Sequence, residues 1–315
     1  MLDFVGKRYW YFALSLLVII PGAVSLIFFG LNRGIEFTSG TTMTVGFTRP
    51  VGEAELRQEY AAQGYADAII QHIVGTNDYF VRTRELTSDD RTKLDTGLKA
   101  KFADGVGDKA IKEFASVSPI VAAEIEQNAI RAVIAAAIGI LLYITFAFRK
   151  VAKPFRYGTC AIIAMVHDIL VVLGIFSLLG KFAGVEIDAL FIAGVLTVVG
   201  YSVHDTIVVF DRVRENSLRG KIKEFSSIVN VSIMETLARS LNTTLTTLFV
   251  IVALFLFGGI TIHNFVLTLL IGIITGTYSS IFNAAQLLVV WENKEWGKFI
   301  SWVPGLGSLG SARAK

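Results

Sequence analysis

The sequence predicts a membrane α-helical bundle of six transmembrane helices, with an α/β domain inserted after the first helix. Hydrophobic residues make up 53% of the chain and charged residues only 17%. Six apolar segments are long enough to cross a bilayer, whose core of about 30 Å needs about 20 helical residues. A polar stretch with strand and helix patterns separates the first two segments. These observations together exclude an ordinary soluble domain.

The six segments divide the chain into parts. They cover residues 10–31, 130–148, 156–179, 188–210, 241–260 and 264–290. The first is longer than the core of a signal peptide, so we expect an uncleaved helix. The expected domains are the N-terminus with helix 1 (1–31), the α/β domain (32–129), helices 2–6 (130–290) and a flexible tail (291–315). Within the third part we expect a loop at 211–240 that carries an amphipathic surface helix.

Basic residues lie mostly on one side of the membrane in this arrangement. Lys7 and Arg8 precede helix 1, and others lie at 149–156, at 212–239 and after helix 6. The short loops on the other side contain only Lys181. Basic loops of membrane proteins stay in the cytoplasm. We therefore expect both termini to be cytoplasmic and residues 32–129 to be extracytoplasmic.

The inserted segment has the pattern of a small α/β domain. We expect strands at 41–47, 68–74, 79–86 and 110–117, and helices at 53–63 and 87–102. Thr87 or Ser88 is the expected cap of the second helix. The order βαββαβ is typical of a ferredoxin-like domain. That fold hosts unrelated functions and does not identify one.

The fourth segment carries an ionisable residue inside the membrane. Asp205 lies about four residues from the end of the segment, at a depth of roughly 6–9 Å. Partial desolvation favours the neutral form of a carboxyl there, which makes Asp205 a candidate proton carrier. A structural hydrogen bond within the bundle is the alternative. The neighbouring His204 could assist proton transfer or simply pack as a polar residue.

The fifth segment begins with a cation that could pair with this carboxylate. Arg239 can match Asp205 in depth, and a nearby guanidinium favours the charged carboxylate. Anchoring of the helix end at lipid headgroups is the alternative role for Arg239. Thr243 and Thr247 follow it and could line a polar path between helices.

The third segment holds a second carboxyl near its middle, Asp168, which follows His167. Adjacent side chains on a helix point in different directions, so these two do not form a metal pair. Asp168 is a candidate for a secondary proton path or for a packing role against neighbouring helices.

The sequence contains no sign of a cofactor, metal or catalytic site. One cysteine, Cys160, and four scattered histidines do not form a zinc-binding pattern. No phosphate-binding loop or protease motif is present, and nothing suggests nucleic-acid binding. We therefore expect a membrane protein that is not an enzyme and takes its energy from elsewhere.

Three stretches resemble the SecF branch of the SecD/SecF protein-export family, within the RND transporter superfamily. The motif after helix 1 includes Gly34, Glu36, Phe37 and Gly40. The other two similar stretches are 200–215, with the sequence GYSVHDTIVVFDRVRE, and 239–248, with the sequence RSLNTTLTTL. Glu36 stands where the family has Asp, Ser39 where it has Gly, and His204 where it usually has Asn.

The resemblance implies a function. A SecF-like chain would join SecD in the bacterial inner membrane and use the proton-motive force to help the SecYEG channel move a preprotein. Asp205 would be the proton-binding carboxylate and Arg239 its partner. The alternatives are half of a proton-driven exporter of small molecules or lipids, and an assembly subunit that transports nothing.

Overall fold

The computed structural model describes residues 2–73, 75–102, 105–106, 110–151, 153–220, 222–259 and 262–296. The chain divides into two compact units. The helical unit combines Met1–Asn32 with Arg131–Lys315, and the sheet unit is Arg33–Ile130. Each unit is described by itself below.

Within the described residues, six helical runs are long and apolar enough to cross a membrane, in agreement with the predicted number. Five are single helices: α1 (Arg8–Phe29), α5 (Pro119–Ala147), α6 (Phe155–Ala183), α7 (Ala189–Arg219) and α8 (Phe225–Phe257). The sixth run contains α9 (His263–Ser279), a π-helical turn (Ser280–Ala284) and α10 (Ala285–Glu292). The π-helical turn matters because such turns in α-helices often lie at functional sites.

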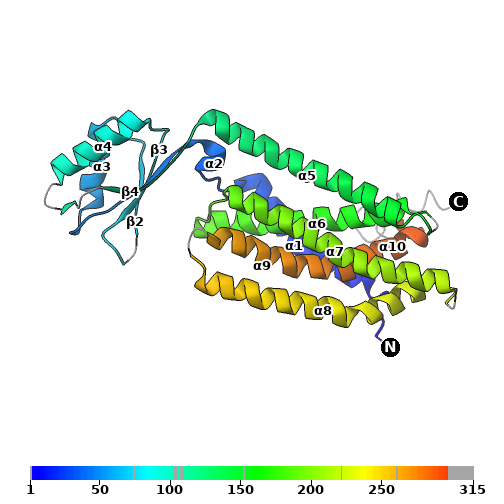
Figure 1. The fold of residues 1–315 in the computed structure, drawn as a ribbon. Helices are drawn as coiled ribbons and strands as arrows, with labels where there is room; N and C mark the ends of the chain where they lie inside the picture. The colour runs from blue at the N-terminus through cyan, green and yellow to red at the C-terminus, as the bar shows by residue number, and fades with distance from the viewer. Residues whose placement is uncertain are drawn as a thin grey trace. The chain divides into compact units, whose positions relative to one another are not determined.

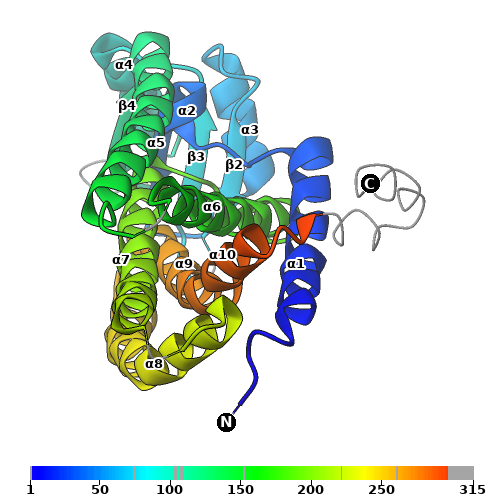
Figure 2. The ribbon, with the colours of Figure 1, turned by 90° about the vertical axis from the view of Figure 1, so that its right-hand side faces the viewer.

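Helix α9 lies at the centre of the helical unit (Figures 1 and 2). It packs against α6, α7 and α8, while α6 also packs against α1. Helices α5 and α8 leave most of their apolar segments exposed, whereas about half of the apolar segments of α6 and α7 is buried. The polar groups of α6, α7 and α9 are therefore shielded best from the surroundings.

Glycines allow two of these helix pairs to approach closely. A Cβ atom added to Gly22 of α1 would lie 2.8 Å from the Cα atom of Gly174 on α6. A Cβ atom on Gly272 of α9 would lie 2.1 Å from the Val198 side chain of α7. Small residues at helix crossings permit such contact in membrane proteins. Because these helices approach closely, the serines near the glycines come within hydrogen-bond distance of neighbouring helices.

The segment between the fourth and fifth helices differs from the prediction. Among the described residues, helix covers most of 211–240, because α7 continues to Arg219 and α8 begins at Phe225. Ile228, Val229 and Ile233, which lie in the expected surface helix, belong to α8 and are buried in the core. Most of the expected flexible tail lies outside the described residues.

The sheet unit contains four antiparallel strands in the order β2-β3-β1-β4. After the short helix α2 (Ile35–Thr38), the elements are β1 (Gly40–Val45), α3 (Glu53–Ala62), β2 (Ile69–His72), β3 (Tyr79–Thr83), α4 (Ser88–Lys101) and β4 (Ile111–Val117). Met43, Val45 and Val81 of the strands form one core with Leu56 and Leu94 of the helices. Strand alternation places Thr42, Thr44, Phe80 and Arg82 on the opposite face of the sheet.

Thr87, one of the two residues predicted as the cap, is the cap of α4. Its hydroxyl accepts a hydrogen bond from the Asp90 amide, and the Asp90 carboxylate accepts from the Thr87 amide, which completes a capping box. Hydrogen bonds from Thr87 hold the pKa of the Asp90 carboxyl below its usual value.

The turn between α2 and β1 requires a glycine at residue 40 and would accept one at residue 39, the position just before it. Gly40 has φ of +119°, and a Cβ atom there would lie 2.7 Å from the Thr83 carbonyl oxygen. Ser39 has φ of 61° and ψ of 172°, a backbone conformation that residues other than glycine rarely adopt.

We therefore predict opposite effects of two substitutions in this turn. Gly40→Ala should lower the free energy of unfolding by about 1–3 kcal/mol, since it adds strain of that size. Ser39→Gly should raise it by about 1 kcal/mol, because the strain it relieves exceeds the entropy that glycine adds to the unfolded chain. Thermal unfolding of the full-length variants in detergent measures both effects. Shifts in the same direction would contradict the assignment of strain to Ser39.

Candidate functional site

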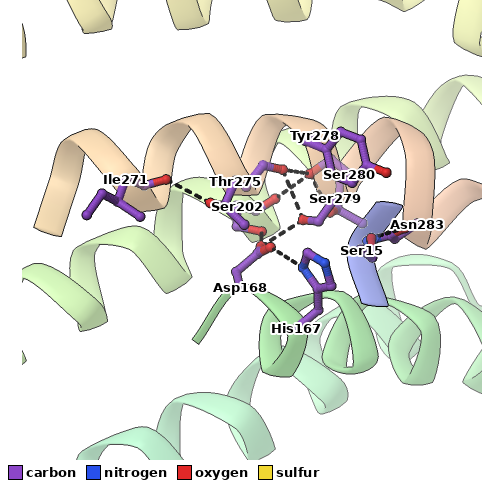
Figure 3. A network of polar contacts seen from close by, with 12 residues as sticks. Ser15, His167, Asp168, Ser202, Ile271, Thr275, Tyr278, Ser279, Ser280 and Asn283 are labelled. Carbon is purple, nitrogen blue, oxygen red and sulfur yellow. Dashed lines mark hydrogen bonds and ion pairs between the residues drawn. The ribbon is translucent and has the colours of Figure 1, made fainter. Parts of the chain in front are cut away.

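The best-satisfied polar group inside the helical unit is the carboxylate of Asp168 on α6, which is fully buried. Its Oδ2 atom accepts hydrogen bonds from Ser202 of α7 at 2.5 Å and from Ser279 of α9 at 2.7 Å. Its Oδ1 atom lies 2.9 Å from Nδ1 of His167. Figure 3 shows the serines and His167 converging on this carboxylate from three helices. Asp168 thus connects α6, α7 and α9.

The π-helical turn extends this network along α7. Ser280, its first residue, donates a hydrogen bond to the carbonyl oxygen of Ser202 at 3.1 Å. The Ser280 hydroxyl also lies 2.9 Å from the hydroxyl of Thr206. Because Thr206 directly follows Asp205, the network around Asp168 reaches the residue beside the second carboxylate.

Asp205 is also buried but is only half satisfied. It lies on α7, and its Oδ1 atom accepts a hydrogen bond from Ser240 of α8 at 2.7 Å. Its Oδ2 atom is buried without a hydrogen-bond partner in the described part of the chain. A buried carboxylate oxygen without a donor is unfavourable, and protonation removes its charge. Asp205 is one helical turn along α7 from Ser202, which donates to Asp168. The carboxylates of Asp168 and Asp205 therefore lie near the same part of α7.

The structure selects different α8 residues from those expected. The buried polar residues of α8 follow a spacing of four and face α7 and α9: Ser232, Thr236, Ser240 and Thr244. The Thr244 hydroxyl lies 3.1 Å from that of Tyr201 and 2.8 Å from that of Thr277. Sequence reasoning missed this stripe, although its regular spacing on one helix face was a readable signal.

The threonines of the expected polar path, Thr243 and Thr247, bond within their own helix, and the path itself stays a prediction. Thr243 is exposed and donates to the carbonyl oxygen of Arg239, and Thr247 donates to that of Thr243. Neither contacts Asp205. Both hydroxyls are satisfied by their own helix because a threonine can bond the carbonyl four residues earlier.

Arg239 and His204 lie on the surface of the helical unit. Both are exposed. The expected ion pair between Arg239 and Asp205 is absent among the described residues, because Ser240, the next residue along α8, takes the inward position. His204 is adjacent to Asp205 but points to a different side of α7, so neither residue contacts the carboxylate in this arrangement.

The motif after helix 1 belongs to the sheet unit. Gly34 caps α2 and its carbonyl oxygen accepts from the Thr38 hydroxyl at 3.0 Å, while Phe37 is buried. Glu36 is half-buried, and Gly40 provides the turn into β1. These residues shape a tight connection between helix and strand.

The described residues hold no group of three or more side chains that could bind a metal ion. Cys160 is free and buried.

Comparison with known proteins identifies the family. Residues 98–294 match the family described as "Protein export membrane protein SecD/SecF, C-terminal", and residues 24–51 match the "SecD/SecF GG Motif". The chain is 51% identical, over 94% of its length and 95% of the relative, to "Protein translocase subunit SecF" of Thermobaculum terrenum. It belongs to the SecD/SecF family.

Other members of the SecD/SecF family extend this relationship. A protein of the same name from Anaerolinea thermophila is 44% identical over 94% of this chain and 96% of its own. The crystal structure of SecDF, titled a translocon-associated membrane protein, from Thermus thermophilus superposes with a TM-score of 0.77 at 34% identity. That match covers 93% of this chain and 39% of the SecDF chain. The chain is thus a multi-pass SecD/SecF-family translocase subunit.

We predict that Asp168→Asn destabilises the helical unit by about 1–3 kcal/mol. An amide carries no charge, so the hydrogen bonds from Ser202 and Ser279 weaken, and its NH2 group can face Nδ1 of His167 only if the imidazole changes its tautomer. Asp211→Asn is the matched control, because Asp211 is an exposed carboxylate on α7. Thermal unfolding in detergent should show a clear loss for the first variant and almost none for the second. Equal stability of both would contradict a structural role for Asp168.

Proposed function

We propose that this chain uses the proton-motive force to assist protein translocation, with Asp205 as the group that takes up and releases the proton. The observation that carries this proposal is the buried Oδ2 atom of Asp205, which has no partner among the described residues. Protonation removes the charge of this carboxylate, whereas each oxygen of Asp168 already lies within hydrogen-bond distance of a partner. Asp205 can therefore change its charge with less rearrangement than Asp168.

The contacts of Asp205 suggest how protonation would move helices. Ser240 bonds the carboxylate and joins α7 to α8, and Thr244, one turn further, contacts Tyr201 and Thr277. Protonation weakens the hydrogen bond from Ser240 because the acceptor loses its charge. Rotation of α8 would then bring Arg239, the adjacent residue, toward Asp205, where its positive charge favours release of the proton and pairs with the carboxylate that remains. Moving one charge through the membrane potential supplies about 2.3 kcal/mol per 100 mV.

The surface of α7 and α8 supports a second transmembrane subunit as partner. His204, Arg239, Asn242, Thr243 and Thr246 are all exposed within spans of these helices. Polar side chains at that depth are unfavourable against lipid and usually face protein or water. We propose SecD as the subunit that covers them. The SecDF protein of Bacillus subtilis, of which this chain covers 38%, supports the proposal since its name joins both halves.

The remaining assignments belong to the same proposal. The sheet unit, with its element order and antiparallel pairing, would be a ferredoxin-like domain outside the cytoplasm that moves relative to the helices. Both termini would be cytoplasmic, and the membrane would be the bacterial inner membrane. The SecYEG channel and the translocating preprotein would be the further partners.

We predict that Asp205→Asn abolishes the part of preprotein export that depends on the proton gradient. Asparagine keeps the acceptor for Ser240 but neither binds nor releases a proton. The chain would be reconstituted with SecD and SecYEG, and export measured with and without a gradient. Asp211→Asn should retain the full response. If Asp205→Asn retained it too, the proton site would lie elsewhere and an assembly role would be favoured.

We also predict contact between α8 and SecD. A photoreactive phenylalanine analogue in place of Thr246 should cross-link to co-expressed SecD. The same analogue in place of Leu17, an exposed apolar residue of α1, serves as the control. Equal cross-linking from both positions, or none from α8, would contradict this interface while leaving the role of Asp205 open to its own test.

A further inference from the structure

A separate cavity lies at one end of the helical unit, where α6 and α8 begin and α7 ends. It has a volume of about 280 Å³. Three cations line it, with a single carboxylate: Lys150, Arg156, Lys223 and Glu292. Arg156 forms an ion pair with Glu292, and neither lysine has an ion pair within the described ranges. The cavity therefore presents two uncompensated positive charges.

The polar groups of the cavity are suited to an anion. Ser217 is one of the lining residues, and its Oγ atom is buried without a hydrogen-bond partner among the described residues. Helix α6 begins there after Pro154, with no side-chain cap and no acidic residue in its first turn. The positive dipole end of this helix favours an anion nearby.

The rest of the lining is apolar, which favours a lipid over a soluble anion. Six residues supply this surface: Val151, Tyr157, Leu218, Phe225, Ile228 and Leu288. Leu218 is 60% exposed, so the apolar surface continues outward from the cavity. The cavity also lies at the ends of helices that are long and apolar enough to span a membrane, and lipid headgroups lie near the ends of such helices.

We propose that this cavity binds the headgroup of an anionic phospholipid. Lys150 and Lys223 would hold the phosphate and Ser217 would donate to one of its oxygens. Basic pockets between membrane helices recognise anionic headgroups in this way. The inference does not depend on Asp205, on the proton gradient or on SecD.

The test measures binding of phosphatidylglycerol to the full chain in detergent by native mass spectrometry, with phosphatidylcholine as the neutral lipid. The double variant K150Q/K223Q should weaken phosphatidylglycerol binding about 30-fold, since each lysine near an anionic lipid is worth about fivefold. The matched control R149Q/K153Q removes two exposed cations between α5 and α6 that do not line the cavity. It should change phosphatidylglycerol binding little.

Ser217→Ala provides a second test that alters no charge. It should weaken phosphatidylglycerol binding about twofold to tenfold through loss of one hydrogen bond. It should not lower the unfolding temperature without lipid, because Ser217 Oγ has no partner to lose. Equal losses of phosphatidylglycerol binding in both double variants would show that general surface charge, and not the cavity, attracts the lipid. Displacement of phosphatidylglycerol by inorganic phosphate at similar concentration would indicate a soluble anion and overturn the lipid proposal.

Discussion

The helical unit depends on the need to satisfy a fully buried carboxylate without water. Asp168 meets this need by accepting from Ser202 and Ser279 on two other helices. Polar groups inside a membrane bundle must find partners within the protein, so this requirement fixes which faces of α6, α7 and α9 meet. The glycines of α9 make that meeting close enough for serine side chains to reach.

The two buried carboxylates differ in a way that suggests a division of roles. Asp168 has donors on both oxygens, and its network changes little unless helices separate. Asp205 has one donor, Ser240, and one oxygen without a partner among the described residues. A buried carboxylate with an unpartnered oxygen, such as that of Asp205, is stabilised most by binding a proton. Hydrogen bonds run from Asp168 through Ser202 and Ser280 to Thr206, the residue that follows Asp205.

Features at the periphery of the helical unit concern its surroundings. Polar side chains on the outer faces of α7 and α8, Arg239 and His204 among them, are unfavourable against lipid, and the proposed protein partner would cover them. The cavity beside Lys150 and Lys223 combines positive charge with apolar lining, which is the basis of the proposed lipid site. The two proposals thus rest on two different surfaces of the helical unit.

The sequence by itself determined the six apolar helices, the strand order along the sheet unit, the Thr87 cap and Asp205 as a buried carboxyl, because these follow from local periodicity and composition. Tertiary structure alone decided that Ser240 faces Asp205 while Arg239 faces outward, and that residues 211–240 extend two helices. Helices α7 and α8 carry apolar residues on most sides, so periodicity does not specify which face turns inward. The contacts of neighbouring helices make that choice, through the few polar groups that must be satisfied.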